Sequence, residues 1–77
     1  MSRSIIATKA RYLKEINHAI DQAQRKKDQV SVDAADGVNI YAFAPDRNGE
    51  VAWGVVERGK NILQGRRRPN GEDYGMC

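Results

Sequence analysis

Residues 38–57 constrain the fold most, because they have the pattern of a β-hairpin with two apolar faces. Residues 38–44 and 51–57 are rich in β-branched and aromatic side chains, and a Pro-Asp-Arg-Asn-Gly segment breaks the pattern between them. The rest of the sequence offers only one amphipathic helix to cover this hairpin. We therefore expect a small domain with surplus hydrophobic surface, which in a monomer usually marks a binding face.

The amphipathic segment covers residues 5–27. Its apolar side chains recur at spacings of three and four, which predicts a single helix with one apolar stripe. The stripe consists of Ile6, Ala10, Leu13, Ile16, Ala19, Ile20 and Ala23. Three basic residues, Arg25 to Lys27, stand where the helix dipole favours positive charge, and this supports an end near Lys27.

Short alternating segments at residues 30–33 and 62–67 extend the hairpin on both sides. Consecutive short strands joined by short turns usually pair with their neighbours. The sequence thus predicts an α+β domain over residues 1–68, in which an N-terminal amphipathic helix packs on an antiparallel β-meander. The meander has three strands, or four if residues 30–33 are included. Residues 69–77 lack a periodic apolar pattern and are expected to form a flexible tail.

The register of the hairpin decides which side chains share a face. Pro45 has no amide hydrogen, so we place it in a five-residue loop and pair Ala44 with Glu50. This register collects the large aromatic side chains on one face: Tyr41, Phe43 and Trp53. The helix would then pack on the opposite face, where side chains are small. Two alternatives stay open: the aromatic face is the core, or a two-residue Asn48-Gly49 turn shifts the register and mixes the faces.

An exposed aromatic face would need a cover. Three rings of about 150 to 250 Å² each would form a patch as large as the largest on typical monomers. The candidates are a second copy of the chain, a different protein, single-stranded nucleic acid, and the chain's own tail through Tyr74 and Met76.

Charge is distributed unevenly along the chain, whose net charge is +3. Residues 1–30 carry +4, residues 31–57 carry −4 and residues 58–77 carry +3. The densest cluster is Arg66-Arg67-Arg68, with Arg58 and Lys60 in the turn before it. Such a cluster can be a solvated strand end that discourages edge-to-edge aggregation. It can also contact phosphates or an acidic protein surface.

The sequence contains no pattern typical of catalysis or of metal binding. His18 is the only histidine and Cys77 the only cysteine, and neither has a partner residue that would activate it. We therefore expect no enzyme activity, no cofactor and no metal site. No apolar run approaches the roughly 20 residues needed to cross a bilayer. The single cysteine and the lack of a signal-peptide pattern lead us to expect a cytoplasmic protein.

The sequence as a whole predicts a non-enzymatic binding protein that docks on a macromolecular partner and blocks or adapts it. A protein partner is the main expectation, and a homodimer is an alternative. The predicted interface consists of Tyr41, Phe43, Trp53, Arg58, Lys60, Arg66, Arg67 and Arg68. In size and style the chain is similar to the small accessory inhibitors that phages and mobile elements make against host protein complexes. The rival hypothesis is a nucleic-acid-binding protein that stacks bases on the aromatic face beside the basic strand end.

Overall fold

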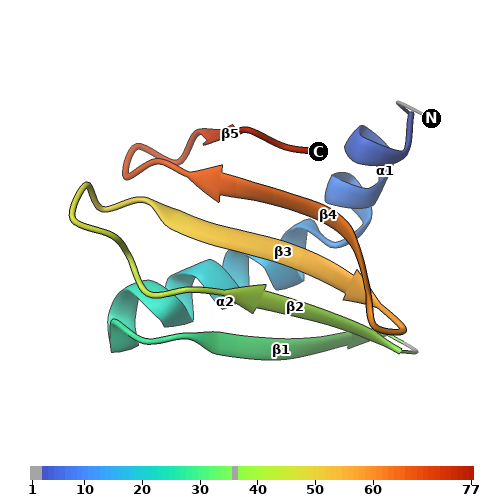
Figure 1. The fold of residues 1–77 in the computed structure, drawn as a ribbon, viewed down its shortest axis with the longest axis horizontal. Coiled ribbons are helices and arrows are strands. Elements are labelled where there is room, and N and C mark those ends of the chain that lie inside the picture. Colours follow the sequence, from blue (N-terminus) through green and yellow to red (C-terminus); the bar gives the residue numbers. More distant parts are fainter. Residues whose placement is uncertain (1–2, 36) are drawn as a thin grey trace.

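The chain folds into two helices packed on one face of a five-stranded antiparallel sheet (Figure 1). The structure is a computed structural model that describes residues 3–35 and 37–77, with side chains from Ile5 onward. Its elements are α1 (Arg3–Arg11), α2 (Leu13–Lys26), β1 (Val30–Ala35), β2 (Val38–Ala42), β3 (Val51–Glu57), β4 (Lys60–Arg67) and β5 (Asp73–Tyr74). The strands lie in the sheet in chain order, so the predicted α+β class and antiparallel meander are confirmed.

The predicted single helix is divided into two at Tyr12. This residue has non-helical backbone angles (φ −111°, ψ 19°), and its side chain is buried in the core. The break changes the direction of the chain, so that α2 crosses the sheet behind β1 to β3 while α1 lies towards β4 (Figure 1). The predicted stripe was therefore wrong in its first half, where Ile6 is 78% exposed and Ile5 packs on the core instead.

The second helix follows the prediction closely. Its buried side chains have the expected spacing of three and four residues: Ile16, Ala19, Ile20 and Ala23. It ends at Lys27, which adopts the left-handed conformation (φ 53°) and donates its amide hydrogen to the carbonyl oxygen of Ala23 at 2.8 Å. This left-handed cap satisfies a carbonyl that the helix end would otherwise leave unpaired.

The C-terminal residues are part of the sheet, which corrects the expectation of a flexible tail. Asp73 and Tyr74 pair with β4 as a fifth strand, so the sheet has five strands and not three or four. Beyond them, Cys77 and Gln64 exchange two backbone hydrogen bonds of 3.1 Å. Met76 packs against the buried core. A single apolar side chain on an otherwise polar segment was too weak a pattern to predict this docking.

The β2–β3 register differs by one residue from the prediction. Tyr41 lies opposite Gly54 and Ala42 lies opposite Trp53, whereas the expected partner of Tyr41 was Trp53. A slip of one residue moves every side chain of a strand to the other face relative to its partner. Trp53 therefore faces the helices and is 1% exposed, while Tyr41 and Phe43 face away from them.

The physical reason for this register is the burial of Trp53. On the helix side it joins the apolar side chains of three strands, and the core contains Val38, Ile40, Ala42, Val51, Val55 and Leu63. The β2–β3 loop accommodates the shift because Asp46 accepts hydrogen bonds from the amides of Asn48 and Glu50, at 2.8 and 3.0 Å. This side-chain turn replaces the strand pair predicted between Ala44 and Glu50.

Candidate functional site: the open face of the sheet

Both helices lie on one side of the sheet, so the side chains that alternate to the other side form an open face (Figure 1). Strand pairing assigns these residues to it: Ser31, Asp33, Asn39, Tyr41, Phe43, Ala52, Gly54, Val56, Asn61, Gln64, Arg66 and Tyr74. Most of them are uncharged and polar or aromatic. Of the predicted interface, this face brings together Tyr41, Phe43 and Arg66.

Tyr41 lies flat across the middle of the open face because its cross-strand partner is a glycine. A Cβ atom at Gly54 would approach the Tyr41 hydroxyl oxygen to 2.2 Å, so only glycine leaves room for the ring. The hydroxyl oxygen of Tyr41 reaches β4, where it accepts a hydrogen bond of 3.0 Å from the Asn61 side chain. The ring is thereby fixed over three strands and does not swing freely into solvent.

Phe43 extends the aromatic surface at the end of β2. Its ring centroid is 5.2 Å from that of Tyr41, with the two planes tilted by 55°, and its side chain is 44% exposed. Beside the two rings the surface has a hollow of about 320 Å³. The hollow is bounded mainly by Tyr41, Phe43, Ala52, Gln64 and Arg66. It combines an aromatic wall with an amide and a guanidinium group, so it can accept an apolar side chain and hydrogen-bond its backbone.

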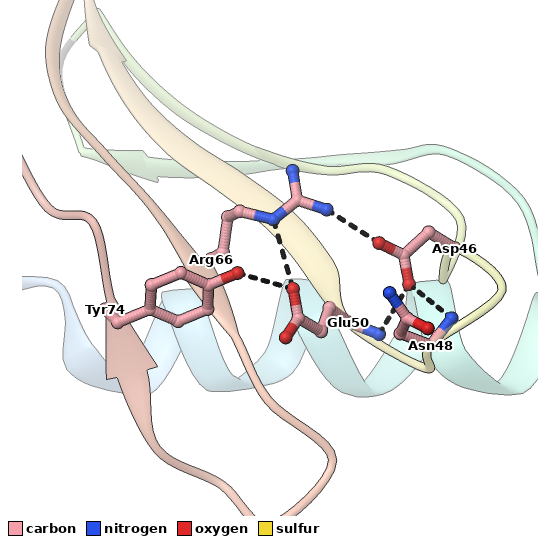
Figure 2. Close-up of polar contacts among 5 residues, drawn as sticks. All are labelled: Asp46, Asn48, Glu50, Arg66 and Tyr74. Atoms are coloured by element: carbon pink, nitrogen blue, oxygen red, sulfur yellow. Dashed lines mark hydrogen bonds and ion pairs between the residues drawn. The ribbon is translucent and has the colours of Figure 1, made fainter.

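An ionic cluster closes one end of the open face, where the β2–β3 loop meets β4 and β5 (Figure 2). Arg66 donates hydrogen bonds to Asp46 at 2.7 Å and to Glu50 at 3.4 Å. The Tyr74 hydroxyl donates to the same Glu50 carboxylate at 2.5 Å. The Arg66 cluster, defined as Asp46, Glu50, Arg66 and Tyr74, therefore holds the loop against the C-terminal strand.

The hydrogen bonds of this cluster shift its ionisation. Backbone hydrogen bonds from Glu50 and Asn48, together with Arg66, lower the pKa of Asp46 against the opposing effect of burial. The hydrogen bond to Glu50 raises the pKa of Tyr74, because loss of the phenolic proton would place two negative charges side by side. The same carboxylate raises the pKa of Arg66. The cluster thus pairs one guanidinium group with two carboxylates and has a surplus of negative charge.

Arg67 lies on the other side of the sheet, although it is adjacent to Arg66 in the chain. It donates two hydrogen bonds to the Asp73 carboxylate, at 2.7 and 3.0 Å, and one to the Asn17 side chain of α2 at 2.7 Å. Lys9 of α1 lies 2.7 Å from the same carboxylate. Burial raises the pKa of Asp73, but the hydrogen bonds from Arg67 and Lys9 outweigh it and the pKa is lowered. This ion-pair group joins both helices to β4 and β5.

The other predicted basic residues are spread over the molecule. Arg68 forms an exposed ion pair with Glu72 at 2.9 Å, and its guanidinium lies 4.0 Å above the centre of the Tyr74 ring. Arg58 lies in the β3–β4 turn and Lys60 begins β4, at the opposite end of this strand from the arginine run. Lys60 is roughly 20 Å along the strand from Arg66, given about 3.3 Å per residue. The arginine run and the turn therefore do not form one basic patch.

Within residues 3–35 and 37–77, no group of three or more His, Cys, Asp and Glu side chains is placed to hold a metal ion. His18 is an exposed residue of α2, and Cys77 is an exposed thiol. The open face offers shape, aromatic surface and hydrogen-bonding groups, which are the properties of a binding surface.

Comparisons with known proteins found no family model, no curated protein sequence and no solved structure that matches this chain. Among the described helices, none combines the length and the apolar character that a bilayer crossing requires.

Sequence reasoning missed several contributors to the open face. Gln64 was assigned to a strand but not to the site, and Tyr74 was considered only as a cover for aromatic residues. The acidic partners of Arg66 lie 16 and 20 residues away in the β2–β3 loop, so their contact depends on the pairing of β3 with β4. A clue was present in the charge pattern, because an acidic middle segment lies between two basic ones.

Proposed function

We propose that the protein is a non-enzymatic binding module that docks on another protein through the open face and blocks or adapts it. The observation that carries this proposal is the hollow beside Tyr41 and Phe43. No described element covers it, and the Phe43 side chain at its wall is 44% exposed. Aromatic side chains are enriched at protein interfaces because they bury large areas and lose little conformational entropy. A reducing cytoplasmic setting is part of the proposal.

A protein partner is favoured over nucleic acid by the compensation of charge at this surface. Arg66 is paired with two carboxylates, and Arg68 is paired with Glu72. Contact with a phosphate would require breaking these pairs, while Asp33, Asp46 and Glu50 would repel it. A neutral or weakly basic protein surface meets no such opposition.

The proposal can be tested by placing a photo-crosslinking phenylalanine analogue at position 43. The matched control carries the analogue at position 6, because Ile6 is an even more exposed apolar residue on the helix side of the molecule. In cells that express the protein, we expect crosslinking to a discrete protein at position 43 and not at position 6. Equal crosslinking at both positions, or none at position 43, would contradict a role for the open face.

Single-stranded nucleic acid is a second candidate because Tyr41 and Phe43 are adjacent rings on an antiparallel sheet, an arrangement on which bases can stack. Fluorescence anisotropy of labelled oligonucleotides at about 50 and about 200 mM salt separates the two candidates, because phosphate binding weakens steeply with salt. Binding that falls with salt and is abolished by Phe43→Ala would favour nucleic acid. No change in anisotropy at the lower salt concentration would remove this candidate.

A further inference from the structure

The outer edge of β1 is a second surface with unmet bonding capacity. β1 is the first strand of the sheet and pairs only with β2, so the backbone groups on its other side have no strand partner among the described residues (Figure 1). β1 is six residues long and pairs regularly with β2 from Val30 to Asp33, with a bulge between Asp33 and Ala35. It contains neither proline nor lysine, two residues that commonly protect such edges. The opposite edge of the sheet is a two-residue strand. β1 is therefore the natural place for strand addition.

We propose that two copies of the chain pair antiparallel along β1, with Val32 opposite Val32 of the second copy, to form one continuous ten-stranded sheet. Residues that face each other across antiparallel strands must point to the same side of the sheet, which limits a two-fold pairing to a few registers. Centring on Val32 places Ser31 opposite Asp33, so the hydroxyl can donate to the carboxylate. Centring on Asp33 would place two carboxylates face to face and is disfavoured.

The side chains on the helix side fit the same pairing. Val30, Val32 and Ala34 are only half-buried in one copy, and a second β1 would cover them further. Val32 also borders a hollow of about 450 Å³ that is lined by side chains of α2: Lys14, Glu15, Asn17 and His18. A two-fold axis through Val32 brings this hollow next to its copy. Lys14 and Glu15 bring charges of opposite sign to this hollow, so neither sign dominates where the copies meet.

The size of the edge sets the expected strength of the dimer. The molecule is 32 Å long and 18 Å thick, so joining two copies along β1 buries on the order of 1,000 Å² in total, near the lower limit for specific interfaces. Interfaces at this limit are typical of weak, transient association, so we expect a reversible dimer. Because the two-fold axis is perpendicular to the sheet, both open faces point the same way and are left free.

Charge substitutions at Ser31 test the pairing and its register together. Ser31 is exposed in one copy, so neither Ser31→Lys nor Ser31→Asp should disturb the fold, which circular dichroism would verify. In the proposed register each new side chain faces Asp33 of the other copy, twice per dimer. Two attractive or repulsive cross-strand pairs should strengthen the dimer roughly three- to ten-fold with lysine and weaken it similarly with aspartate.

Sedimentation velocity from about 5 to about 500 μM would measure the dissociation constants, in a reducing buffer that prevents disulfide formation through Cys77. Opposite effects of the two substitutions would support the proposal. A protein that stays monomeric over the whole range, a dimer that neither substitution affects, or a dimer that both weaken would each overturn it. A dimer that both substitutions weaken would mean that Ser31 faces Ser31, and a dimer that neither affects would place the interface elsewhere. None of these outcomes bears on the open face, whose test is crosslinking at position 43.

Discussion

The two faces of the sheet carry aromatic residues of opposite character. On the helix side, Trp53 is 1% exposed and surrounded by apolar side chains from three strands and α2. On the open side, Phe43 is 44% exposed and Tyr41 lies flat over a glycine. The difference teaches that alternation along a strand assigns aromatic residues to separate tasks. Trp53 is part of the core, whereas Tyr41 and Phe43 lie on the face that we propose as the binding surface.

Arg66 and Arg67, although adjacent in the chain, differ in the same way: one ion pair is exposed and the other is buried. Arg67 is largely buried between the sheet and both helices, with a carboxylate that is itself 3% exposed. Arg66 is at the edge of the open face in a more solvated cluster. Deleting one partner of an ion pair that is removed from water costs much more folding stability than deleting one partner of an exposed pair. We therefore expect substitutions on the helix side to change stability and those on the open face to change binding.

The largest effect is expected for Trp53→Ala. Removing a fully buried indole leaves a large cavity and should lower the free energy of unfolding by about 3 to 5 kcal/mol. Chemical denaturation followed by circular dichroism would measure this loss. Phe43→Ala is the matched aromatic truncation on the other face. Similar losses for both variants would show that the two faces do not differ as described.

Asp73→Asn should have the next largest effect, about 2 to 3 kcal/mol near neutral pH, because Arg67 and Lys9 would lose their charged partner. The lowered pKa of Asp73 determines how the stability difference between wild type and Asp73→Asn changes with pH. A carboxyl group with a pKa below its unfolded value of about 3.9 stabilises the fold above that pH, and the contribution is lost as pH falls through the folded-state pKa. The difference between wild type and variant should shrink accordingly.

Glu72→Gln is the control for Asp73→Asn, because Glu72 forms an exposed pair with Arg68. We expect a change of less than about 0.5 kcal/mol at any pH. Unfolding curves of the three proteins at neutral pH and at pH values below about 4 make the comparison. A constant difference between wild type and Asp73→Asn over this range would exclude the proposed ionic role.

Gly54→Ala tests the seat of Tyr41 on the open face. The added methyl group would collide with the ring, and the resulting displacement should cost about 1 to 3 kcal/mol. The double variant with Tyr41→Ala removes the collision. The cost of Gly54→Ala should then fall to near zero or change sign, which thermal or chemical unfolding of the four proteins would show. Equal costs in both backgrounds would mean that the ring does not lie there.

The smallest effect on stability is expected for Phe43→Ala. A side chain that is 44% exposed contributes little to the core, so the change should stay below about 1 kcal/mol. The partner identified by crosslinking at position 43 should nevertheless be captured at least several-fold less by this variant in an affinity pull-down. An unchanged yield from a folded variant would remove Phe43 from the interface.

Much of the secondary structure could be predicted from periodicity. The α2 stripe and the β3 strand have strong local patterns: β3 has the predicted bounds, and α2 ends within a residue of the predicted helix end at Lys27, although it begins only at Leu13. The strand count and the break at Tyr12 could not be predicted in the same way. Met76 and Tyr12 are held by tertiary burial, which outweighs the local preference of their segments.

The site was predicted only in part because it depends on register. Shifting the hairpin by one residue moved Trp53 into the core and left Tyr41 and Phe43 on the open face. The loop residue Asp46 accommodates this register by accepting hydrogen bonds from two amides, and the sequence pattern indicated only an ordinary turn there. The acidic partners of the arginine run were likewise hidden by their sequence distance. Pairing across strands cannot be derived from composition alone.

The central claim is that the two faces of the sheet differ in exposure, and hydroxyl-radical footprinting with mass spectrometry tests it most directly. Indole reacts with hydroxyl radicals at least as readily as a phenyl ring, so chemistry alone would not protect Trp53. We predict that Phe43 is oxidised rapidly in the folded protein while Trp53 is oxidised only after unfolding. Rapid oxidation of Trp53 in the folded state, at a rate similar to that of Phe43, would contradict the account.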